Sequence, residues 1–84
     1  MPLETPPDAR PLASVATGTV GRLALGAVPR TSAPRLAQLG LRAGAAVTVL
    51  ARTAGGGRLV AVGTTRIGLD RDTSRQLALL PAAS

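Results

Sequence analysis

The 84-residue chain lacks cysteine, histidine, lysine and every aromatic residue. Without cysteine it has neither disulfides nor thiolate metal sites, and nothing points to an oxidising compartment. Without aromatics, a hydrophobic core must be built from Leu, Val, Ile and Ala, each of which buries little area. Because so short a chain gains little net free energy from apolar burial, we expect one small domain of marginal stability, or one stabilised by a partner.

We also expect no segment that directs the chain to export or into a membrane. The first ten residues contain two acids and three prolines, the reverse of a basic segment followed by an apolar one, so we expect no signal peptide. No apolar run approaches the roughly 18 residues that span a bilayer. We therefore expect a cytoplasmic protein with no membrane insertion.

Ten arginines against four acids give the chain a formal net charge of +6. Such a balance favours phosphate-bearing partners, and nucleic acid is the first to consider. The arginines are scattered singly, however, as solvated surface charges are, and there are no aromatic platforms on which single-stranded bases could stack. We expect surface arginines, with Arg58 and Arg66 flanking a glycine-rich loop, and keep non-specific nucleic-acid binding as the alternative function.

Side chains that carry out catalysis or hold metals are almost absent. Beyond the first ten residues the only acids are Asp70 and Asp72, on a turn that either of them could cap. We expect them to cap that turn and to pair with Arg71 or Arg75. First-row metals prefer imidazole, thiolate or clustered carboxylates, so the sequence predicts no enzyme, no cofactor and no metal site.

The periodicity predicts short strands and little helix. Residues 1–10 are rich in proline and polar residues and are predicted to be a disordered leader, with the domain at 11–81 and a tail at 82–84. Within the domain we expect a helical turn or loop closing at Gly18, followed by strands. The predicted strands cover 19–25, 45–52, 58–62, the region of Ile67 and Leu69, and 76–80, with a hairpin loop at 53–57.

The stretch RLAQLGLRAG, residues 35–44, predicts a short helix that is followed at once by a strand. Leu36 and Leu39 share one helix face, and Gly40 stands where a left-handed C-terminal cap is needed. Leu41 then occupies the position that commonly contacts the helix, and Gly44 completes a tight turn. From residue 45 the apolar period becomes two, which is typical of a half-buried strand.

This stretch, continued as AAVTVL and followed by a glycine-rich hairpin and VGTTRIGLDRD, resembles the ferrous iron transport protein A (FeoA) family. The motif R-L-x-x-L-G-L-x-x-G runs from Arg35 to Gly44, and the likeness covers residues 11–81. The resemblance implies a mostly β fold: a small SH3-like barrel of five to six strands with a short helix inserted after the first strand. The closely spaced strands and turns agree with a barrel, because closure removes exposed sheet edges.

The resemblance also implies a function. FeoA-like proteins are expected to be cytoplasmic accessory proteins that contact FeoB, the membrane ferrous iron permease with a GTPase domain, and modulate iron uptake. A similar domain ends iron-dependent repressors, but this chain has no helix-turn-helix with which to read an operator. The family suggests transition-metal binding, yet the residues predict that any link to iron passes through the partner. Self-association remains open.

The helix and the turn after it are the predicted partner-binding site. The residues assigned to it are Arg35, Leu36, Leu39, Leu41, Arg42 and Leu50, with Gly40 and Gly44 as structural turns. We expect Leu36 and Leu39 in the core, and Leu41 exposed beside Leu50 and Arg42 in a small apolar patch with a basic rim. The alternative is that the three helix leucines only plug the open end of the barrel.

Overall fold

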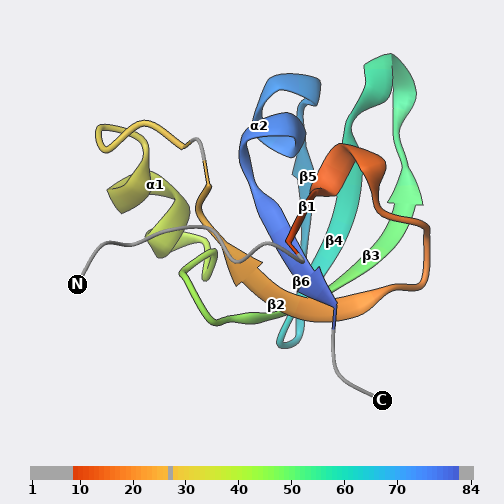
Figure 1. Cartoon of the computed structure of the whole chain (residues 1–84), viewed down its shortest axis with the longest axis horizontal. Coiled ribbons are helices and arrows are strands. Elements are labelled where there is room, and N and C mark those ends of the chain that lie inside the picture. The colour runs from red at the N-terminus through yellow and green to blue at the C-terminus, as the bar shows by residue number, and fades with distance from the viewer. Residues whose placement is uncertain (1–8, 27, 82–84) are drawn as a thin grey trace.

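The computed structural model describes residues 9–26 and 28–81, which form one antiparallel sheet of six short strands with two six-residue helices (Figure 1). The strands are β1 (Arg10–Pro11), β2 (Val20–Ala24), β3 (Ala46–Arg52), β4 (Arg58–Val62), β5 (Thr65–Leu69) and β6 (Ala78–Pro81). The helices are α1 (Ala33–Gln38) and α2 (Arg71–Gln76), and two 3₁₀ turns are η1 (Leu12–Ser14) and η2 (Ala54–Gly56). The predicted mostly β class is confirmed.

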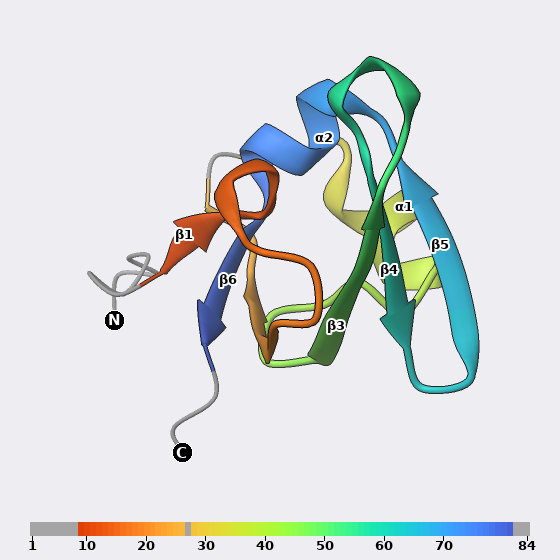
Figure 2. The same cartoon turned by 90° about the vertical axis from the view of Figure 1, so that its right-hand side faces the viewer.

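The strand order is β1-β6-β2-β3-β4-β5, and the sheet coils around a single core (Figure 2). Strand β2 is central because it pairs with both β3 and β6. The SH3-like architecture is therefore as predicted, with α1 inserted after the strand expected at 19–25. The predicted closure differs: within the described ranges, β1 and β5 remain the two ends of the sheet.

The core is entirely aliphatic, as the missing aromatics require. Residues from β2 to β6, from η1 and α1, and from the segments beside them converge on it. The buried apolar side chains are Leu12, Val15, Leu23, Leu36, Leu41, Val47, Val49, Val60, Ile67, Leu69, Leu77 and Leu79. In β3 the buried residues Val47 and Val49 are two positions apart, which confirms the period of two read from the sequence there.

The glycine-rich stretch 53–57 is the predicted hairpin loop between β3 and β4. Gly55 and Gly56 adopt φ angles of 80° and 88°, a left-handed conformation that favours glycine. The pairing of the two strands shifts by one residue between Val49 and Ala51, so Leu50 is the extra residue of a β-bulge. The bulge leaves Leu50 half-buried instead of fully on the outer face.

The change from helix to strand occurs as predicted. The amide of Gly40 donates to the carbonyl of Ala37 at 3.0 Å, and that of Leu41 donates to Leu36 at 2.9 Å. These two bonds are the 5→2 and 6→1 pair of a Schellman motif, with Gly40 at φ 90°. A Cβ on Gly40 would lie 3.3 Å from a methyl of Val62, so the end of α1 rests against the end of β4.

The predicted leader and tail fall largely outside the described residues. Arg10, assigned to the leader, is instead the first residue of β1 and pairs with Leu79 of β6. Residues 1–8 and 82–84 are not described. In the part of the chain that is, no helix has the length and apolar character needed to cross a bilayer.

Candidate interaction surface

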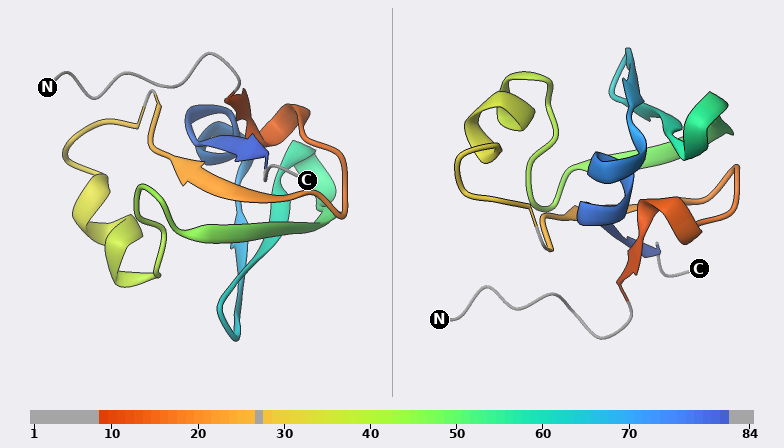
Figure 3. Two further views of the ribbon diagram at one scale, coloured as in Figure 1. Left: turned by 60° about the horizontal axis from the view of Figure 1, so that its bottom comes forward. Right: turned by 90° about the horizontal axis from the view of Figure 1, so that it is seen from above.

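Helix α1 stands to one side of the strands, joined to them by the connections from β2 and to β3 (Figures 1 and 3). Pro34 lies in its first turn, where a missing amide costs no intrahelical bond, and no side chain caps its start. Leu36 is the only buried residue of the helix. Most of the surface of α1 is therefore available to a partner.

The structure reverses the expected places of two leucines. Leu41, predicted to be exposed, is 1% exposed, whereas Leu39, predicted to be in the core, is 46% exposed. The reason is the Schellman motif, which turns the chain at Gly40 and folds Leu41 back onto Leu36. The predicted patch of Leu41, Leu50 and Arg42 is therefore not formed.

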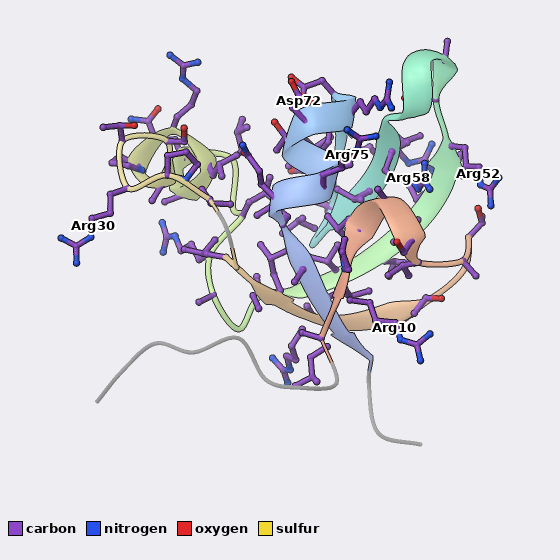
Figure 4. The ribbon with its side chains drawn as sticks, turned by 45° about the horizontal axis from the view of Figure 1, so that its top comes forward. Arg10, Arg30, Arg52, Arg58, Asp72 and Arg75 are labelled. Atoms are coloured by element: carbon purple, nitrogen blue, oxygen red, sulfur yellow. The ribbon has the colours of Figure 1, made fainter. Side chains whose placement is uncertain are left out.

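Basic residues precede and follow the exposed leucine in the chain. Arg30, Arg35 and Arg42 are all exposed, and the segment 25–45 contains no acid. Figure 4 shows Arg30 pointing away from the rest of the protein beside α1. We call Arg30, Arg35, Leu39 and Arg42 the basic helix surface. Sequence reasoning missed Arg30, although three arginines without an acid in this segment were a signal for it.

The backbone that carries this surface is fixed at its far end by a fourth arginine. The guanidinium of Arg22, on β2, donates to the carbonyl of Gly44 at 3.0 Å. Gly44 itself has a φ of 86° and lies within the turn that is closed by the amide of Ala45, which donates to the carbonyl of Arg42 at 3.0 Å. Arg42 therefore leaves the chain from a defined turn, as the sequence predicted.

Arg58 is a second correction, because it is not a surface charge. It is 6% exposed, and its guanidinium donates to the carbonyl of Gly57 at 2.9 Å and to that of Ala13 in η1. Among the residues that the structure describes, its Nε finds no hydrogen-bond partner. Arg58 shares the inner face of β4 with Val60, so strand alternation directs it inward (Figure 4). Arg66 is exposed, as predicted.

The two described carboxylates have structural places. The carboxylate of Asp70 caps α2 by accepting from the amide of Thr73 at 2.7 Å. The backbone hydrogen bond from Thr73, with a further one from its side chain, holds the pKa of Asp70 below its usual value of 3.8. Asp72 lies in the first turn of α2. Residues 9–26 and 28–81 contain no group of three metal-ligating side chains, so they do not fit an iron site.

Known proteins share this fold. A crystal structure of the iron uptake regulatory protein FeoA matches with a TM-score of 0.74 and 20% identity, covering 88% of this chain and 97% of that one. The FeoA protein of Chlorobium tepidum matches with a TM-score of 0.73 and 21% identity over 87% and 71%. A manganese-dependent transcriptional repressor matches with a TM-score of 0.78 and 24% identity, over 94% of this chain and 44% of that one.

The sequence comparisons decide the family. A search of curated protein sequences gives no match. A family model described as the FeoA domain matches residues 10–79, which is most of the chain, and this range contains every element of the basic helix surface. With the matching motif, the matching fold and this coverage, the chain belongs to the FeoA domain family.

Proposed function

We propose that this protein is a cytoplasmic, non-enzymatic accessory protein of ferrous iron uptake that regulates a FeoB-type permease by docking on its cytoplasmic side. Membership of the FeoA family supports the link to iron uptake. A structure with the same fold is named an iron uptake regulatory protein. Iron is the cargo of the permease in this proposal, and the accessory protein acts on its transporter by contact.

The observation that carries the proposal is the basic helix surface. Leu39 is a large apolar side chain held in water at 46% exposure, with arginines before and after it in the chain. Arginine is enriched among the residues that dominate binding energy, because its planar head makes several hydrogen bonds and stacks on other groups. Because Leu36 is the only buried residue of α1, a partner can cover the outer face of the helix without disturbing its packing on the strands.

The proposal is tested by measuring the affinity of the purified chain for the FeoB-type permease of the same organism held in lipid nanodiscs. We expect Leu39→Asp and Arg35→Glu to weaken binding by roughly tenfold or more. Matched controls are Val20→Asp, since Val20 is 49% exposed on β2, and Arg52→Glu at the end of β3. Both controls should change affinity by less than about twofold. Equal losses in variants and controls would contradict the assigned surface.

A gel-retardation experiment separates protein docking from the alternative of nucleic-acid binding. A nucleic-acid contact depends on the arginines, because they neutralise phosphates, and its affinity falls steeply as salt rises. It does not depend on Leu39. If Arg35→Glu abolishes retardation of nucleic acid in a gel at about 150 mM salt while the uncharged Leu39→Ala does not, the alternative replaces the proposal.

A further inference from the structure

The two ends of the sheet differ in how they are protected. Strand β1 is two residues long and contains Pro11, and short length and proline are common protections of an edge. Strand β5 is five residues long, has no proline and pairs in unbroken register with β4. Figure 2 shows β5 as the outermost strand at one side of the molecule. Its outer edge is a candidate for pairing with another strand.

The hydrogen-bonding groups on that edge follow from the turn before β5. Val62 pairs with Thr65 across the two-residue turn Gly63–Thr64, in which Gly63 has a φ of 59°. The pair that flanks such a turn is hydrogen-bonded, and bonded and non-bonded pairs then alternate. The backbone groups of every second residue therefore bond to β4, and those of Arg66 and Gly68 point outward.

We propose that the outer edge of β5 pairs antiparallel with β5 of a second copy of this chain, about a twofold axis at Ile67. In this register Arg66 of each copy faces Gly68 of the other. Each such pair exchanges two backbone hydrogen bonds, so the four outward groups of each strand are all satisfied. The inference is independent of docking on a permease, because it uses the backbone edge of β5 and none of the residues of the basic helix surface.

The side chains on this edge favour a second copy as the occupant. Arg66 and Gly68 lie on the same exposed face of β5, and a Cβ on Gly68 would meet nothing within 4 Å. The twofold register places the long Arg66 side chain over the open face of the partner's Gly68. A shift of the axis to Arg66 would instead put two like charges opposite each other, which is destabilising.

The pairing is weak and its salt dependence is distinctive. One strand edge of five residues buries less than the roughly 1,000 Å² expected of a stable interface, so dimers should form only at high protein concentration. Each copy has a formal charge of +6, and the two copies repel each other. Because salt screens this repulsion, association should strengthen as salt is added. Docking through the basic helix surface should weaken under the same change if its partner is acidic.

The test is sedimentation of the full chain at about 1 mM protein, at low and high salt, with two variants of one residue. Gly68→Pro removes an outward amide without removing a bond to β4, so we expect it to abolish the dimer. Gly68→Ala keeps that amide and its methyl meets open space, so its association should stay within about twofold of wild type. A monomer in every condition, or a dimer that Gly68→Pro leaves unchanged, overturns the proposal.

Amide hydrogen exchange gives a second readout that needs no variant. The amides of Arg66 and Gly68 should exchange fast in dilute protein and slow down at the higher concentration, whereas that of Ile67 is protected in both by its bond to β4. Dimerisation that leaves the Arg66 and Gly68 amides unprotected would place the contact elsewhere and overturn the assignment to β5. Leu39→Asp should change none of these results.

Discussion

The two helices of this protein have six residues each but are held in opposite ways. The carboxylate of Asp70 caps α2, whose Ser74 is fully buried and which packs against η1 (Figures 1 and 4). No side chain caps α1, and its first turn contains no acid. The end of α1 is fixed instead by the backbone bonds around Gly40 and by the burial of Leu36 and Leu41.

This difference indicates a division of roles. Helix α2 packs against η1 and buries Ser74, so one side of it is used by the fold. Helix α1 is attached through two leucines and a glycine turn, and its outer face combines Leu39 with arginines. A short helix is not stable by itself in water, so α1 exists because the barrel holds its end. The barrel thereby presents a preformed surface whose side chains contribute little to stability.

The largest expected effect comes from truncating, in separate variants, the buried Leu41 and the exposed Leu39. Leu41→Ala should lower the free energy of unfolding by about 2–5 kcal/mol, because it empties a fully buried site. Leu39→Ala should lower it by less than about 0.5 kcal/mol, because Leu39 is exposed. Urea unfolding followed by far-ultraviolet circular dichroism measures both. Similar losses in the two variants would show that Leu39 is as important to the packing of the fold as Leu41, which would contradict its place on a free surface.

A smaller effect is expected on the opposite side of the barrel. Arg58→Ala leaves the carbonyls of Ala13 and Gly57 without their donors, and an unsatisfied buried acceptor costs about 1–3 kcal/mol. The matched control Arg52→Ala, at an exposed position paired with Arg58 across β3 and β4, should change stability by less than about 0.5 kcal/mol. The same unfolding assay applies. Equal effects would indicate that Arg58 is a surface charge, as the sequence predicted.

The smallest expected effect concerns the cap of α2 and its response to pH. Because hydrogen bonds from Thr73 hold the folded-state pKa of Asp70 below 3.8, its contribution to stability is complete above that pH. The contribution is lost as the pH falls from 3.8 through the lower folded-state pKa. Asp70→Asn keeps a capping oxygen but does not titrate, so its unfolding free energy should fall less between pH 5 and pH 2. Parallel pH profiles of the two proteins would contradict this.

Much of the fold could be predicted because its signals are local. The left-handed backbone at positions 40 and 44 favours glycine, so the two glycines indicated turns there. The alternating valines of β3 indicated a strand. The acidic start of α2 also follows from local capping chemistry. Of the residues predicted to bind a partner, Arg35 and Arg42 are exposed, and their role in binding stays a prediction. The prediction that Leu41 is the exposed leucine was wrong, because the chain turns at Gly40 and the helical period does not extend to Leu41.

The sequence by itself determined that the core is aliphatic, that a short helix ends at Gly40 and is followed by a strand, and that the charge is basic. Those properties depend on residue types and on neighbours within four or five positions. Only the tertiary structure decided that Leu41 lies inside, that Arg58 is buried against Ala13, and that β5 remains an edge. Each of these depends on segments far apart in the chain, whose meeting no local pattern specifies.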